Sequence, residues 1–122
     1  MSLQKLLSTA LSPQEIDCLV KQELANILAC CKPETLILFG SAARQQMRTC
    51  SDLDLIVIFS SADEIEQGKT SYYCSPRPRT WPVDVLFISR IDFDHRSKRG
   101  GVYLIAAEEG KIIYGGGKHG TP

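Results

Sequence analysis

Apolar residues recur at helical spacing between residues 12 and 33 of the chain. Ser12, Pro13 and Glu15 predict the start of a helix, because a serine N-cap, a proline in the first turn and a glutamate three residues after the cap form a capping box. The apolar positions that follow are Ile16, Val20, Leu24, Ile27, Leu28 and Cys31. Steps of three and four residues predict one amphipathic helix with a buried face, which Pro33 ends.

Short runs of apolar residues recur four times after this helix and predict β-strands. The runs cover residues 35–39, 53–59, 83–88 and 111–114. The first run passes directly into Gly40-Ser41, a turn of small residues, and we expect a brief helix over residues 42–47 after it.

Capping residues, glycines and prolines between the strands predict the remaining elements. These are a helix from the capping box at residues 61–64 to about Gly68, a loop over 69–82, and an amphipathic helix over 102–109 that follows Gly100-Gly101. The length of 122 residues predicts a single domain over residues 1–122, with a core over about 12–115 and a glycine-rich tail over 115–122.

The composition is that of an ordinary globular protein, with 43% hydrophobic and 23% charged residues and no formal net charge. The isoelectric point near 6.7 gives no general attraction for nucleic acid, so no nucleic-acid partner is expected. No apolar run approaches the length of about 18 residues that spans a bilayer, and the N-terminus shows no signal-peptide pattern, so no membrane partner is expected.

The five cysteines argue against a disulfide framework or a zinc site. Their number is odd, two of them are adjacent, and no Cys-x-x-Cys pair occurs; they are Cys18, Cys30, Cys31, Cys50 and Cys74. This usage favours a reducing, cytoplasmic location. We assign Cys18 and Cys31 to the apolar stripe of the first helix, where a cysteine acts as a small hydrophobe.

The candidate chemistry lies in Gly40-Ser41 and in three aspartates. Asp52 and Asp54 share one face of the second strand, because side chains alternate along a strand, and Asp84 lies in the third apolar run. Carboxylates are the ligands that Mg²⁺ prefers, and a glycine-serine turn before a helix can hold phosphate. Each feature alone is commonly a solvated acid or a simple turn. Together they predict a site for metal-assisted nucleotidyl transfer.

Gly40-Ser41, ten intervening residues and Asp52-Leu53-Asp54 resemble the hallmark of the minimal nucleotidyltransferases of the DNA polymerase-β superfamily. Arg44 and the Val83-Asp84-Val85 strand also match. The resemblance implies an α/β (α+β) fold, in which a small mixed sheet of about four strands is flanked by helices. It further implies MgATP or another nucleoside triphosphate as substrate and two Mg²⁺ ions. Gln45 departs from the pattern, since glycine often follows the arginine, and this predicts a tighter helix here.

The resemblance also implies roles for single residues. Asp52, Asp54 and Asp84 are the expected catalytic residues and metal ligands, and Gly40 and Ser41 are expected to bind the triphosphate. Arg44 either contacts a phosphate as well or pairs with a carboxylate and braces the site.

Two groups of side chains lie outside these motifs. Aromatic and basic residues alternate in Tyr72, Tyr73, Arg77, Arg79 and Trp81, a pattern that can stack bases, although a loop that packs its aromatics on the sheet is the plainer interpretation. The basic residues 95–99 are interpreted as a solvated loop or a docking patch rather than an RNA site.

Two functional hypotheses follow. The first is an enzyme that transfers a nucleotide, with AMP from ATP as the favoured case, to a hydroxyl group. We expect the acceptor on a second polypeptide, and the resemblance points to a HEPN-type helical partner, with this chain as the antitoxin of a toxin–antitoxin pair. The second is a nucleotide-binding or docking module that neutralises its partner by binding alone. Self-association, the base and the acceptor stay open.

Overall fold

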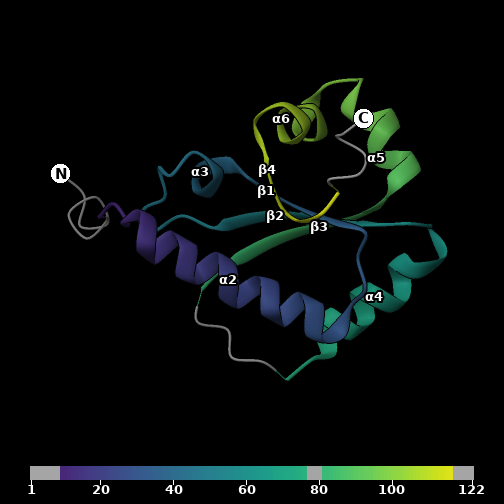
Figure 1. Cartoon of the computed structure of the whole chain (residues 1–122), viewed down its shortest axis with the longest axis horizontal. Helices are drawn as coiled ribbons and strands as arrows, with labels where there is room; N and C mark the ends of the chain where they lie inside the picture. Colours follow the sequence, from purple (N-terminus) through teal and green to yellow (C-terminus); the bar gives the residue numbers. More distant parts are fainter. Residues whose placement is uncertain (1–8, 77–80, 117–122) are drawn as a thin grey trace.

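A computed structural model of the chain describes residues 9–76 and 81–116. Within these ranges four strands form one sheet in the order β3-β2-β1-β4 (Figure 1). Their bounds are β1 Thr35–Phe39, β2 Leu53–Phe59, β3 Val83–Ser89 and β4 Lys111–Gly115. β1 pairs antiparallel with β2 and β4, whereas β2 and β3 are parallel. The predicted mixed sheet of four strands is therefore confirmed, with boundaries correct to one residue.

Helices cover both faces of the sheet (Figure 1). α2 (Pro13–Cys30) and α4 (Asp63–Cys74) lie on one face, and α5 (Arg90–Ser97) and α6 (Gly101–Glu109) lie on the other. Because side chains alternate along β2, its odd-numbered residues pack under α2 and α4, while Ile56 and Ile58 pack against α5 and α6. None of the helices in the described ranges is long and apolar enough to cross a membrane.

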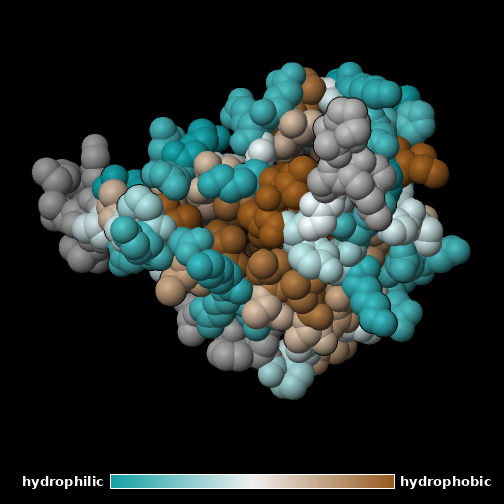
Figure 2. Space-filling view, viewed as in Figure 1, coloured by the Kyte–Doolittle hydropathy of each residue, from teal (hydrophilic) through white to brown (hydrophobic). Residues whose placement is uncertain are grey.

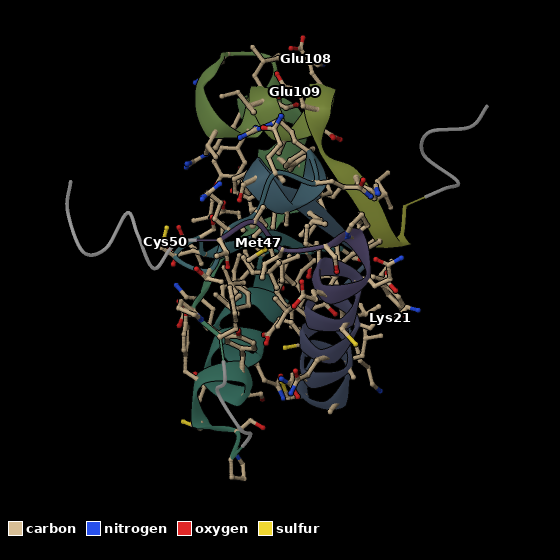
Figure 3. All side chains as sticks on the ribbon, turned by 90° about the vertical axis from the view of Figure 1, so that its left-hand side faces the viewer. Lys21, Met47, Cys50, Glu108 and Glu109 are labelled. Atoms are coloured by element: carbon tan, nitrogen blue, oxygen red, sulfur yellow. The ribbon has the colours of Figure 1, made fainter. Side chains whose placement is uncertain are left out.

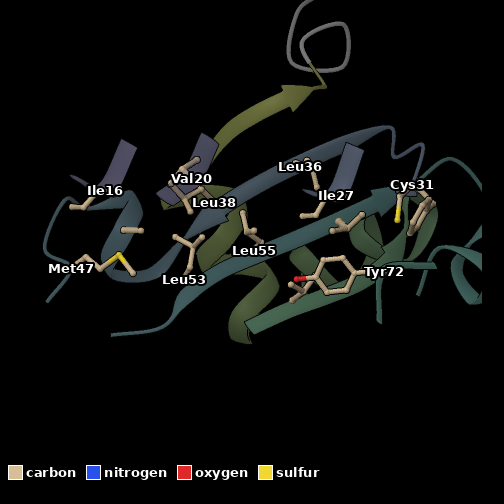
Figure 4. Packing of buried hydrophobic residues seen from close by; sticks show 14 residues of the cluster. Ile16, Val20, Ile27, Cys31, Leu36, Leu38, Met47, Leu53, Leu55 and Tyr72 are labelled. Carbon is tan, nitrogen blue, oxygen red and sulfur yellow. The ribbon is translucent and has the colours of Figure 1, made fainter. Parts of the chain in front are cut away.

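The capping box that begins α2 forms as predicted. The Ser12 hydroxyl accepts a hydrogen bond from the Glu15 backbone N–H at 3.1 Å, and the Glu15 carboxylate accepts one from the Ser12 N–H at 2.8 Å. Cys31 follows the helix and is buried (Figure 4). The placement of Cys18 in the buried stripe is wrong, since this residue is exposed. It lies two residues from Ile16, which turns it to the far side of a helix.

α4 extends well beyond its predicted end. The prediction of a stop near Gly68 and of a loop from Lys69 is wrong, because the helix continues to Cys74. Gly68 is a contact point: a Cβ atom there would lie 2.4 Å from the Cζ atom of Phe59. Its bare backbone therefore lets the helix approach the sheet closely, and the glycine serves packing rather than termination.

α5 is an element that apolar spacing did not indicate. Of the two interpretations of residues 95–99, a solvated loop or a docking patch, the loop is wrong for residues 95–97, because α5 runs from Arg90 to Ser97. Phe93 is its only buried residue, so no apolar stripe marks it. Ser89 is the N-cap of α5, and its hydroxyl accepts a hydrogen bond from the Asp92 N–H at 3.2 Å. A serine at this position is the signal in the sequence that could have indicated the start of the helix.

The helix predicted over residues 42–47 is shorter and earlier than expected. α3 covers only Gly40–Ala43, and Gln45 has φ = +56°, so the expected tighter helix is wrong. This left-handed turn directs the chain back to the sheet, where Met47 is fully buried between α2 and β2 (Figure 4). The Met47 carbonyl accepts a hydrogen bond from the Leu11 N–H at 2.9 Å. The segment that joins the glycine-serine turn to the aspartates is thus anchored at its middle.

Some sequence-based expectations lie outside the described residues. They include Arg77 and Arg79 and the tail from residue 117 onward. That residues 1–122 form a single domain stays a prediction.

Candidate functional site

Asp54 and Asp84 lie side by side at one end of the sheet. They are partners in the register of β2 and β3, and parallel partners on adjacent strands lie about 5 Å apart. Both lie on the face of the sheet that, farther along the strands, packs against α5 and α6. Asp52 precedes β2 by one residue and is exposed. The parallel register therefore gathers acids from two separate segments at one edge.

Gly40 is pressed against the carboxylate of Asp54. β1 ends at Phe39, whose register partner is Asp54, and Gly40 follows with φ = +74°. A Cβ atom on Gly40 would lie 2.3 Å from Oδ2 of Asp54. A side chain is therefore excluded on two grounds, the left-handed backbone and the acid beside it. Ser41, the next residue, is half-buried in the single turn of α3.

Asp54 is affected by burial and by the charges around it. The pKa of the Asp54 carboxyl is raised above its usual value, first by burial and then by the charges of Asp84 and Asp52. Arg44 acts in the opposite direction and lowers the same pKa. The charged form of Asp54 is thus disfavoured in the protein alone, and a positive charge placed beside it would relieve that cost.

Arg44 contacts residues at the rim of the site. Its Nε donates a hydrogen bond to Oε1 of Gln46 at 3.2 Å, and its Nη1 lies 3.9 Å from Oε1 of Glu109. Glu109 is the last residue of α6 and is labelled in Figure 3. Both side chains are about half exposed, so the pair is weak. Arg44 therefore pairs with a carboxylate, although this is one of α6 rather than one of the three aspartates.

The donor chemistry of these acids suits a hard divalent cation. Three carboxylates supply the oxygen ligands that Mg²⁺ prefers, and they leave coordination positions for phosphate and water. In the part of the chain that the structure describes, no three His, Cys, Asp or Glu side chains are gathered closely enough to hold a metal as they stand. Like charges repel, so the carboxylates have to turn towards a shared cation to bind it. The residues fit the metal in kind and in strand position.

The aromatic residues between β2 and β3 have separate roles. Tyr72 is buried, donates a hydrogen bond to Oε2 of Glu23 at 2.5 Å and packs against Phe87, so it belongs to the core. It does so from α4 rather than from a loop. Trp81 is half-buried, and its Nε1 donates to the backbone carbonyl of Ser51 at 3.0 Å. Sequence reasoning missed this contact, and it did not identify Glu109 as the carboxylate with which Arg44 pairs.

Comparison with known proteins identifies the family and the fold of this chain. Residues 22–114, which include all the proposed site residues, match the family described as polymerase beta, nucleotidyltransferase. The chain belongs to this family. A solved structure from Sulfolobus solfataricus, described as a "putative nucleotidyltransferase", has the same fold with a TM-score of 0.56. It is 15% identical, and the alignment covers 85% of this chain and 84% of that one. No curated protein matches the chain.

Membership of the polymerase beta nucleotidyltransferase family confirms the broader part of the resemblance. Nucleotidyl transfer is the chemistry to which the family description refers. The minimal subtype and the pairing with a HEPN-type protein are finer expectations, and they are taken up below as proposals.

Proposed function

We propose that this chain is a magnesium-dependent nucleotidyltransferase that transfers AMP from ATP to a hydroxyl group. The observation that carries the proposal is the pairing of Asp54 with Asp84 on parallel strands, with the bare backbone of Gly40 against the Asp54 carboxylate. Family membership supplies the class of reaction.

Each acid has a role that follows from its place. Asp52, one residue before β2, and Asp54, within β2, are the proposed ligands common to both cations. Asp84 is exposed on the neighbouring strand, where it can complete one cation's ligands and also face an incoming acceptor. Two bound Mg²⁺ ions would supply Lewis-acid stabilisation of the attacking oxygen and of the pyrophosphate.

The transfer step balances with groups that this chain supplies. The acceptor oxygen attacks the α-phosphorus of ATP and forms the new O–P bond. The bond from the α-phosphorus to the bridging oxygen of the β-phosphate breaks, and pyrophosphate leaves with that electron pair. The acceptor proton passes to the carboxylate of Asp84. Gly40 and Ser41 hold the triphosphate through backbone N–H groups and the serine hydroxyl, and Arg44 adds positive charge at the rim.

The acceptor belongs, in this proposal, to a HEPN-type helical protein of which the chain is the antitoxin. Large apolar side chains that are partly exposed support a protein partner: Ile91, Val102, Ile105, Ile112 and Tyr114 are 38–67% exposed. They lie on α5, α6 and β4. Figure 2 shows apolar side chains gathered across the middle of one face, where β4 lies in Figure 1. A protein surface of this kind is typical of an interaction site.

Incubation with ATP labelled at the α-phosphate, Mg²⁺ and the co-purifying partner tests the proposal. We expect label on the partner, with at least a hundredfold loss in Asp52→Asn and Asp54→Asn. Asp63→Asn is the matched control, because Asp63 is an exposed aspartate on α4 and lies apart from the site. A stable complex that carries no label and is unaffected by the first two substitutions would instead identify a docking module.

A further inference from the structure

The exposed acid Asp52 lies outside the sheet, yet the residues on both sides of it are held firmly. Asp54 is part of β2, where pairing with β1 and β3 fixes its backbone. Asp52 precedes that strand and has no register partner. The Ser51 hydroxyl accepts a hydrogen bond from the Arg48 N–H at 3.0 Å, and the Ser51 N–H donates to the Arg48 carbonyl at 2.9 Å. Two further hydrogen bonds, one to Ser51 and one from Leu53, complete this support.

That support comes from the two residues before β3. Nε1 of Trp81 donates to the Ser51 carbonyl at 3.0 Å, and the Leu53 N–H donates to the Pro82 carbonyl at 3.0 Å. The Ser51 carbonyl and the Asp52 nitrogen and Cα belong to one planar peptide unit. A bond that fixes this oxygen therefore fixes the direction in which the chain enters Asp52. The Trp81 ring also packs against the core cluster beneath β2.

We propose that Trp81 is a positioning residue that sets the carboxylate of Asp52 for metal binding. Trp81 lies three residues before Asp84, so the same indole links the β3 segment that carries Asp84 to the peptide that carries Asp52. The indole thereby fixes the spacing of Asp52 and Asp84. The pairing of β2 with β3 begins only at Leu53 and does not include Asp52. This inference rests on the proposed function, because it concerns the same metal site.

Two replacements at Trp81 separate the N–H from the ring. Trp81→Phe keeps an aromatic ring and loses the donor, and β-(3-benzothienyl)alanine at position 81 keeps the shape of the indole and loses only the N–H. Tyr72→Phe is the control, because it removes the hydrogen bond that the Tyr72 hydroxyl donates to Glu23 and leaves the three aspartates of the site unchanged. All three remove one donor, and only the first two concern Asp52.

The readout is the Mg²⁺ concentration that gives half-maximal transfer, measured beside direct Mn²⁺ binding by electron paramagnetic resonance. We expect both Trp81 replacements to raise the metal requirement about 10- to 100-fold, as loss of a group that orients a ligand does. Excess Mg²⁺ should restore the rate of these proteins but not that of Asp52→Asn. Tyr72→Phe should lower the melting temperature and leave the metal requirement unchanged. Trp81 is the single tryptophan, so its emission should respond to metal in the wild-type protein.

The outcomes distinguish the two proposals. A wild-type protein that binds metal and transfers nucleotide, with both Trp81 replacements at the wild-type metal requirement, overturns the role of Trp81 alone. A wild-type protein that neither binds Mn²⁺ with nucleotide nor transfers label overturns the proposed function and this inference with it.

Discussion

Charged side chains are paired at one end of the sheet and unpaired at the other, within the described residues. At the end where β2 and β3 finish, Nε of Arg90 lies 2.7 Å from Oε1 of Glu34, and the same guanidinium donates to Oγ1 of Thr35 at 3.0 Å. Both charged side chains are mostly buried, at 18% and 15% exposure, and they neutralise each other. At the end where these strands begin, Asp52, Asp54 and Asp84 form no ion pair within the described residues.

The difference shows which end the fold supports and which end it leaves unbalanced. Arg44 is near enough to lower the pKa of Asp54, yet its own contacts are with Gln46 and Glu109. An uncompensated group of acids costs stability, whereas the pair at the other end satisfies its charges. Arrangements that are unfavourable for stability, such as clustered like charges, are found mainly at functional sites. The contrast therefore agrees with a binding role for the acid end and a structural role for the other.

The largest effect is expected from a side chain placed beside Asp54. Gly40→Ala puts a methyl group where Oδ2 of Asp54 lies, so the acid has to move. A displacement of about 1 Å at a catalytic group costs on the order of a hundredfold in rate. Steady-state transfer assays measure this loss.

A control for Gly40 exists within the same chain. Gly101 has nearly the same backbone angle, φ = +75°, but a Cβ atom there meets nothing within 4 Å. Gly101→Ala carries the same backbone strain, about 1–2 kcal/mol, and should keep its rate per folded molecule. Equal rates for the two variants would show that the approach to Asp54 has no catalytic importance.

At the opposite end a substitution should affect stability and spare catalysis. Arg90→Ala removes the partner of a mostly buried carboxylate and a bond to Thr35, so we expect a loss of about 1.5–3 kcal/mol in the free energy of unfolding. Urea denaturation gives the value. Lys21→Ala breaks the exposed pair with Asp17, and we expect it to leave the free energy of unfolding nearly unchanged. If Arg90→Ala also reduces transfer per folded molecule, the Arg90 end of the sheet is not purely structural, and the contrast with the aspartate end is wrong.

How much of this contrast could be predicted from the sequence depends on the range of the interactions. The capping box at Ser12 and the bounds of β2 follow from local residues, and both are confirmed. The end of α4 could not be predicted, because Gly68 reads as a helix stop until Phe59 is known to lie against it. α5 was missed because a single buried residue, Phe93, fixes it to the sheet.

For the candidate site too, the local features could be predicted from the sequence and the long-range ones could not. The motif indicated which acids to examine, since only ten residues separate Gly40-Ser41 from Asp52-x-Asp54 in the sequence. The register that sets Asp84 beside Asp54 is a pairing across 30 residues, and no local pattern specifies it. The bond from Trp81 to Ser51 depends on that register too, which explains why sequence reasoning assigned Trp81 only to packing or base stacking.

Removal of one acid should stabilise the unbalanced end. Asp84→Asn ends the repulsion with Asp54 across the strand pair, and because like charges directly opposite one another destabilise a sheet, its loss should give a small gain in stability. We expect this gain in the free energy of unfolding in buffer with a chelator, together with loss of transfer. Asp63→Asn should have the opposite sign, because Asp63 lies in the first turn of α4, where a negative charge is favourable. A loss of stability in Asp84→Asn would contradict the proposed repulsion.

The smallest effect is the pH dependence that Asp54 contributes. Its folded-state pKa lies above the usual 3.8, so the folded chain binds this proton more tightly than the unfolded chain. The free energy of unfolding from this group therefore rises as pH falls through the folded pKa, and the gain is complete below the unfolded value. Comparison of wild type with Asp54→Asn over that range isolates it. Mg²⁺ affinity should change in the opposite direction, since the cation requires the ionised carboxylate.

In the proposed function, Asp52, Asp54 and Asp84 share divalent cations beside Gly40. Anomalous diffraction from crystals grown with Mn²⁺ and a non-hydrolysable ATP analogue tests it most directly. We expect Mn²⁺ peaks within bonding distance of Asp52 and Asp54, one of them also bound by Asp84, with the triphosphate against Gly40 and Ser41. Mn²⁺ bound elsewhere, or a bound nucleotide with Asp84 turned away from the metal, would contradict it.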